Sequence, residues 1–127
     1  MPETTFPVEV VSGVAVVAVP EEIDITNAAR LRAALLEATA DGSGALVVDM
    51  SRTQFCDSAG LNVLVRAHHR LKAKGGVMLL VISGAAVVRI FAVSGVDHVI
   101  RTFPTLEEAI AQTSSAALNP PRSAEVL

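Results

Sequence analysis

The chain has 127 residues, 51% of them hydrophobic and 18% charged, with a formal net charge of −3. This length suits one compact domain with a single core, and the acidic balance argues against a nucleic-acid-binding protein, which normally carries a basic excess. Trp and Tyr are absent and Phe occurs four times, so stacking on bases or sugars is not expected either.

One cysteine in the sequence excludes an internal disulfide and favours a reducing setting. The N-terminus has no basic segment followed by an apolar one, so we expect no signal peptide. No apolar run approaches the roughly 18 residues that span a bilayer. The sequence therefore predicts a cytoplasmic protein without a membrane partner.

Short apolar runs predict strands in the first part of the chain. Residues 8–11 and 14–19 read as two strands joined by a hairpin turn at Ser12–Gly13. Pro20 ends the second strand, and an acidic loop over 21–24 follows. Thr26 is the predicted N-cap of a helix over 27–40. Its apolar face holds Ala28, Leu31, Leu35 and Ala38.

The middle of the chain reads as strand, loop and helix. A strand over 45–49 is followed by a loop over 51–56 and a helix over 58–73, which Gly75–Gly76 closes. The helical spacing of apolar residues predicts its inner stripe. That stripe holds Leu61, Leu64, Val65, His68 and Leu71. We expect His68 to be partly buried there, with its hydrogen-bonding groups satisfied.

The remaining chain continues the alternation. We predict a buried strand over 77–82, a short strand over 99–102, a last helix over 106–112 and a flexible tail over 114–127. Between the strands lies a helix over 85–93, which carries Val88, Phe91 and Ala92. The pattern indicates a single α/β domain, residues 1–113, with a small mixed, mostly parallel sheet opened by a hairpin.

The junction Asp57–Ser58 carries the most functional information. Asp57 is placed to cap the helix by accepting from the N–H of Ala59 or Gly60, and Ser58 then occupies the first helical position. Unpaired N–H groups and a partial positive charge make such a position suitable for a phosphate. Ala59 and Gly60 leave the backbone open to an approaching protein. The plainer alternative is an ordinary helix start.

Three segments near this junction resemble the STAS domain of bacterial anti-sigma factor antagonists: Glu22-Ile23-Asp24, Val47 to Ser51, and Phe55 to Leu61 with its Asp-Ser-x-Gly-Leu pattern. The similarity extends to 87–91 and 103–109. It implies a small mixed sheet with helices packed mainly on one side. The family often has Gly where this chain has Glu21, and many members have Ser where it has Ala59.

The resemblance also implies a function and its residues. Family members bind an anti-sigma factor that is also a serine kinase, thereby free a sigma factor, and are inactivated by phosphorylation at the serine matching Ser58; we also expect a phosphatase as partner. Asp24 matches an acidic residue placed beside that serine for partner contact, although a solvated loop carboxylate or an alternative N-cap fits it equally. The predicted partner-binding residues are Asp24, Asn27, Asp57, Ser58, Ala59, Gly60 and Asn62.

Other readings are weighed against this one. An enzyme with Ser58 as nucleophile is disfavoured because there is no Gly-x-Ser-x-Gly elbow, and the chain has no phosphate-binding loop of a kinase, so a kinase must act in trans. A STAS scaffold whose serine is never modified, or a nucleotide sensor in a larger signalling or transport assembly, is the alternative.

No cofactor or metal is expected, since His68 and His69 cannot share a helix face, and Cys56 reads as a small packed hydrophobe.

Overall fold

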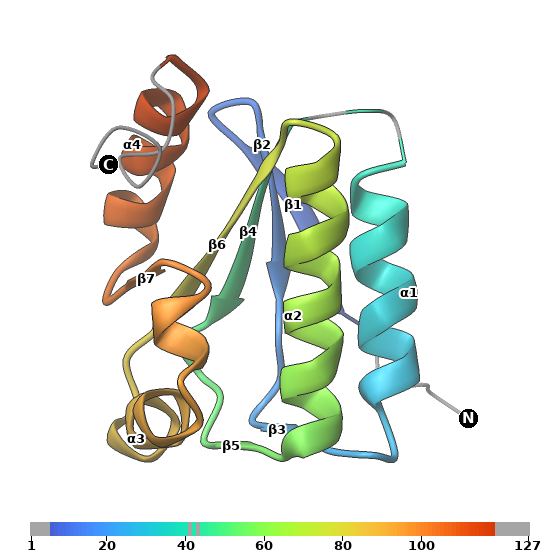
Figure 1. The fold of residues 1–127 in the computed structure, drawn as a ribbon, viewed down its shortest axis with the longest axis vertical. Helices are drawn as coiled ribbons and strands as arrows, with labels where there is room; N and C mark the ends of the chain where they lie inside the picture. Colours follow the sequence, from blue (N-terminus) through green and yellow to red (C-terminus); the bar gives the residue numbers. More distant parts are fainter. Residues whose placement is uncertain (1–5, 41, 43, 119–127) are drawn as a thin grey trace.

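A five-stranded sheet forms the centre of the molecule (Figure 1). The structure is a computed structural model that describes residues 6–40, 42 and 44–118, with side chains as far as residue 113. The strand order is β1-β2-β4-β6-β7, with β1 antiparallel to β2 and the other pairs parallel. This confirms the predicted mostly parallel sheet opened by a hairpin. The strands are β1 (Val8–Val11), β2 (Val14–Ala18), β4 (Ala45–Met50), β6 (Val77–Ile82) and β7 (Thr102–Phe103).

The three central strands are apolar on both faces because helices cover the sheet on both sides. Residues in register across them, such as Val17 and Val48, are fully buried. β1 lies at the edge of the sheet and leaves Val10 exposed. The β1–β2 turn is left-handed at both central residues, Ser12 (φ 52°) and Gly13 (φ 79°), as a tight two-residue hairpin requires.

Three helices cover one face of the sheet and a fourth covers the other, which confirms helices mainly on one side. The larger core lies under α1 (Ala28–Ala38), α2 (Ser58–Ala73) and α3 (Ala85–Ser94). The smaller core lies between β4, β6 and α4 (Leu106–Leu118) on the opposite face. Figure 1 shows α1 and α2 side by side and α4 across the sheet from them.

Helix α2 has the predicted bounds. Gly75 (φ 81°) ends it in the left-handed conformation, and the Gly76 N–H donates to the Leu71 carbonyl at 2.8 Å. Its buried face is rotated slightly from the predicted stripe, and Leu61, Val65 and His68 are only partly buried at its border. The fully buried positions are Gly60, Leu64, Ala67 and Leu71.

His68 corrects one expectation in detail. Its side chain is partly buried as predicted, but Nδ1 is buried and has no hydrogen-bond partner among the residues that the structure describes. A satisfied histidine was therefore the wrong prediction. Burial lowers the pKa of His68, and the charges of His69 and Lys72 act in the same direction.

The sequence predicted Thr26 as the N-cap of α1, and this prediction is wrong. The helix begins at Ala28, with Asn27 in the cap position, and the Thr26 hydroxyl donates instead to Oδ1 of Asp24. The Asp24 carboxylate, two residues upstream, thus binds the Thr26 hydroxyl that was predicted to cap the helix. The helix ends at Ala38, two residues earlier than predicted, where the Thr39 hydroxyl donates to the Leu35 carbonyl at 3.0 Å.

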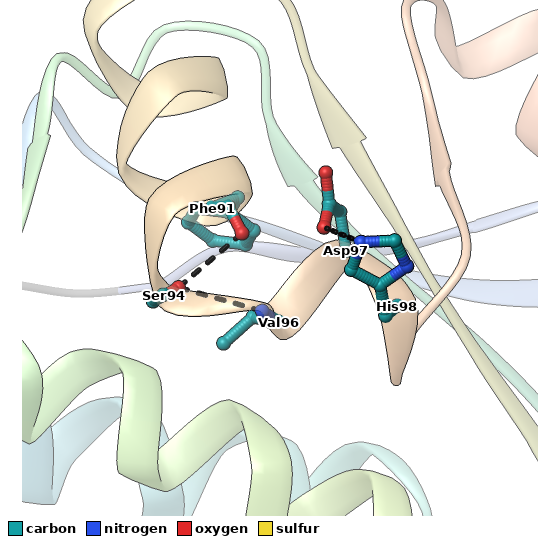
Figure 2. Close-up of polar contacts among 5 residues, drawn as sticks. All are labelled: Phe91, Ser94, Val96, Asp97 and His98. Carbon is teal, nitrogen blue, oxygen red and sulfur yellow. Dashed lines mark hydrogen bonds and ion pairs between the residues drawn. The ribbon is translucent and has the colours of Figure 1, made fainter.

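The predicted strand over 99–102 is also wrong. A 3₁₀ turn, η1 (Val96–His98), follows α3, and the strand is Thr102–Phe103. Figure 2 shows the connection: the Ser94 hydroxyl donates to the Phe91 carbonyl at 3.3 Å and accepts from the Val96 N–H at 3.4 Å. Gly95, left-handed at φ 83°, turns the chain here, which buries Val96 and Ile100.

Helix α3 buries Val87 and Phe91, whereas Val88 and Ala92 are exposed. The end of α4 differs from the prediction. Helix α4 continues to Leu118, so residues 114–118 are helical and not part of a tail; residues 119–127 lie outside the described part of the chain. No helix within the described ranges has the length and apolarity to cross a membrane.

Candidate functional site

A two-stranded parallel ribbon joins the two predicted functional loops. β3 (Glu22–Ile23) pairs with β5 (Phe55–Cys56), and hydrogen bonds from Gln54 N–H to the Glu21 carbonyl (2.7 Å) and from Asp57 N–H to the Ile23 carbonyl (3.0 Å) extend the pairing. The ribbon lies beyond the carboxyl ends of β2 and β4, along the lower edge in Figure 1. Both loops therefore open at the same end of the sheet.

The carboxylate of Asp57 connects both loops. Oδ1 accepts from the Gly60 N–H at 3.1 Å, which confirms the predicted helix cap. Oδ2 accepts from the Ile25 N–H at 3.2 Å, across 32 positions of sequence. One side chain thus fixes the start of α2 and the acidic loop relative to each other.

Ser58 is the first residue of α2 and its side chain is exposed. Its hydroxyl makes no hydrogen bond to any other residue that the structure describes. The first N–H groups of a helix have no acceptor within the helix, and on α2 the Asp57 carboxylate accepts from that of Gly60. The hydroxyl is therefore accessible from solvent.

Gly60 is buried, and the structure gives it a packing role that the sequence did not reveal. A Cβ built on it would lie 2.5 Å from Cγ2 of Ile23 and 2.7 Å from Sγ of Cys56, both side chains of the ribbon. The start of α2 therefore packs on the ribbon at a distance that only glycine permits. Contact of Gly60 with a partner remains a prediction.

Asp24 and Asn27 hold the acidic loop in shape. The Asp24 N–H donates to Oδ1 of Asn27, and Nδ2 of Asn27 donates to the Glu22 carbonyl, both at 2.9 Å. Oδ1 of Asp24 accepts from the Thr26 N–H and hydroxyl. Hydrogen bonds from the side chain and then the backbone of Thr26 lower the pKa of the Asp24 carboxyl.

The remaining predicted residues lie on the first turns of α2. Ala59 is partly buried, while Asn62 is exposed and accepts from Nε of Arg66 at 3.2 Å. The structure thus brings the whole predicted set to one edge of the molecule, and which of these residues contact a partner stays a prediction.

Sequence reasoning missed three residues of this edge. Thr53 is fully buried, and its hydroxyl donates to the Pro20 carbonyl at 2.8 Å, which ties the two loops together ahead of the ribbon. Ile25 and Phe55 are large apolar side chains that remain exposed on the two segments that meet at Asp57. An isoleucine between Asp24 and Thr26, within a polar loop, was the only sequence signal for this exposure.

Cys56 is a packed hydrophobe, as predicted. It is buried between the ribbon and α2, and burial, with the nearby charge of Asp57, raises the pKa of its thiol to about 12. His98, a conceivable base for Ser58, is exposed on η1 and faces Asp97 at 3.8 Å (Figure 2). No interaction within the described residues links it to Ser58.

Comparison with known proteins gives a consistent result. Residues 5–109 match the STAS domain family. The chain is 37% identical over 101 residues to the anti-sigma-F factor antagonist RsfB of Mycobacterium tuberculosis, covering 78% of this chain and 80% of that protein. A crystal structure of an anti-sigma factor antagonist from Mycobacterium paratuberculosis is 34% identical, with a TM-score of 0.80, covering 87% of this chain and 93% of that one. The Bacillus anti-sigma factor antagonist SpoIIAA, in its unphosphorylated form, shares the fold at 24% identity, with a TM-score of 0.73 and coverage of 87% and 97%.

Proposed function

The chain belongs to the STAS domain family, and we propose that it is a cytoplasmic anti-sigma factor antagonist switched by phosphorylation of Ser58. Unmodified, it binds an anti-sigma factor that also has serine kinase activity, and the bound sigma factor is released. Phosphorylation at Ser58 ends this binding, and a phosphatase restores it. The function rests on protein binding and not on catalysis by this chain.

The observation that carries the proposal is the position of the Ser58 hydroxyl. It is exposed in the first turn of a 16-residue helix, next to a loop that the Asp57 carboxylate fixes in place. The helix terminus tolerates an added phosphate within the domain. The modified protein should therefore stay folded while its surface changes.

The switch acts at the contact with the partner. A phosphate adds about −1.5 to −2 charges at neutral pH, directly beside the Asp57 carboxylate. In a complex that covers Ser58, this charge would lose its hydration without gaining a partner. A 100-fold loss of affinity needs only about 2.7 kcal/mol, and a buried unpaired charge costs at least as much.

The experiment uses this protein with the purified candidate anti-sigma factor kinases of its own cell. Incubation with ATP should add one phosphate to the wild-type chain and none to Ser58→Ala, as measured by intact mass. Ser58→Ala should bind the same anti-sigma factor equally well before and after incubation with ATP. Ser58→Asp should bind it at least about 100-fold more weakly than the wild type, as measured by titration calorimetry.

Thr105→Asp is the matched control for Ser58→Asp. It adds the same charge at the start of α4, where the Thr105 hydroxyl accepts from the Glu108 N–H, and α4 packs on the other face of the sheet. The control should bind like the wild type. A chain that binds its anti-sigma factor but gains no phosphate, with Ser58→Asp binding at full strength, would instead be a constitutive scaffold.

A further inference from the structure

Two exposed apolar side chains, Ile25 and Phe55, belong to the two segments that meet at Asp57, the sequence neighbour of Ser58, and we propose that this apolar pair anchors the partner. The proposal rests on the proposed function and specifies its contact surface. The occupant is the surface of the anti-sigma factor, with an apolar pocket at its centre and basic side chains at its rim. Ile25 is 78% exposed and Phe55 is 46% exposed, although both belong to segments that are otherwise firmly held.

The backbone of Ile25 is fixed before any partner arrives. Its N–H donates to Oδ2 of Asp57, and the residues on either side are held by the bonds of Asp24 and Asn27. A large apolar side chain on a rigid loop has already lost most of the backbone freedom that binding would remove. Such preorganised apolar residues contribute more to affinity than their area alone indicates.

The ribbon fixes Phe55 in a similar way. Successive side chains of a strand point to opposite sides. Because the Cys56 side chain is buried, the Phe55 side chain points outward. Gly60 lets α2 pack directly on Cys56 and Ile23, which leaves the ribbon no room to turn Phe55 inward. The exposure of Phe55 is therefore a consequence of the packing that positions Ser58.

The charges around the apolar pair indicate the chemistry of the partner. Segments 21–27 and 53–62 contain four acidic residues, and the only basic residue directly adjoining them in sequence is Arg52, which lines a pocket with Glu21 and Glu22. The acidic residues are Glu21, Glu22, Asp24 and Asp57. An apolar centre with a net acidic surround is complementary to an apolar pocket with a basic rim.

This arrangement explains why a phosphate on Ser58 would prevent binding to a partner that carries positive charges. Ser58 follows Phe55 by three residues and adjoins Asp57, which holds Ile25. A phosphate there would enter the apolar centre of the contact and not its basic rim. The loss of its hydration would then outweigh the attraction at the rim.

The experiment compares binding of the purified anti-sigma factor kinase to four variants of the full chain. Ile25→Ser and Phe55→Ser should each weaken binding at least about 10-fold, and Ile25→Leu should bind within about threefold of the wild type because it keeps an apolar anchor. Val10→Ser is the matched control and should bind as the wild type does. Val10 is 74% exposed on β1, near the hairpin turn at the opposite end of the sheet. Circular dichroism of each variant shows whether the fold is intact.

The outcomes separate this proposal from the proposed function. If Ser58→Asp prevents binding while Ile25→Ser and Phe55→Ser bind like Val10→Ser, the apolar pair is not the anchor. The proposed phosphorylation switch at Ser58 is then retained. If Ile25→Ser and Phe55→Ser bind the anti-sigma factor normally but no longer self-associate in analytical sedimentation, the apolar pair contacts a second copy of this chain and the proposal is overturned. If the wild type binds no anti-sigma factor kinase, the proposed function fails and the anchor proposal fails with it.

Discussion

Replacing Gly60 by alanine tests whether the close packing of α2 on the ribbon shapes the site. The new Cβ would lie 2.5 Å from Ile23 and 2.7 Å from Cys56, which is 0.9 Å and 0.7 Å short of the 3.4 Å at which ordinary contact begins. Both neighbours are buried side chains, 0% and 2% exposed, so neither can swing into solvent. Overpacking of this kind costs about 1–3 kcal/mol, and two such contacts favour the upper end.

Alanine also has a higher helix propensity than glycine, worth about 1 kcal/mol, so the expected net loss for Gly60→Ala is about 2 kcal/mol. Urea unfolding followed by circular dichroism measures it. The matched background is Ile23→Leu, because the β carbon of leucine carries no second γ carbon at the Cγ2 position. There the cost of Gly60→Ala should fall by at least about 0.5 kcal/mol. A Gly60→Ala protein as stable as the wild type, or an equal cost in both backgrounds, would refute the packing argument.

Three further predictions concern single side chains. Asp57→Ala should lose about 1 kcal/mol of unfolding free energy because two N–H groups lose their acceptor, and Asp57→Asn should retain part of it; equal losses in urea titrations would contradict this. The lowered pKa of His68 means that the folded chain binds fewer protons than the unfolded chain below about pH 6.5, so stability should decrease as pH falls from 7 towards 5. This decrease should disappear in His68→Gln and persist in His98→Gln, as thermal melts at several pH values would show. Cys56, with its pKa raised to about 12, should react with a thiol reagent at pH 8 only when the chain unfolds; rapid labelling of the native protein would show that the thiol is accessible.

The central strands and α2 were predictable because local pattern and tertiary environment agree. β6 is a continuous apolar run and β4 is interrupted only by Asp49, which is the pattern expected of parallel strands covered on both faces. The Asp57 cap and the Gly75–Gly76 end mark both boundaries of α2 with residues that have a specific structural reason to be there. The residues that carry the resemblance around Ser58 lie together at one end of the sheet.

The ribbon was not predictable because its strands are only two residues long and each leaves one of its two residues exposed. Its stability depends on residues that meet only after the sheet has formed, such as Thr53 bonding to Pro20 and Gly60 packing on Ile23. No period-2 pattern can be recognised in so short a segment. The Asp57–Ile25 bond, which organises the site, is for the same reason visible only in three dimensions.

The errors after α3 have a different cause. Val96, Val99 and Ile100 resemble a strand in composition, but Gly95 turns the chain and the spacing of Val96 and Ile100 suits a tight helical turn. On α3 itself nearly every residue is apolar, so the sequence offered no contrast from which to select the buried face. Tertiary packing selected Val87 and Phe91 instead.

The tight turn between β1 and β2 has a practical consequence. β2 runs from this turn towards the end of the sheet that holds Ser58, and its five residues alone span about 16 Å. An epitope tag inserted between Ser12 and Gly13 would therefore immobilise the protein on a sensor chip with the serine directed into the flowing sample. Loop tips of this kind tolerate insertions well.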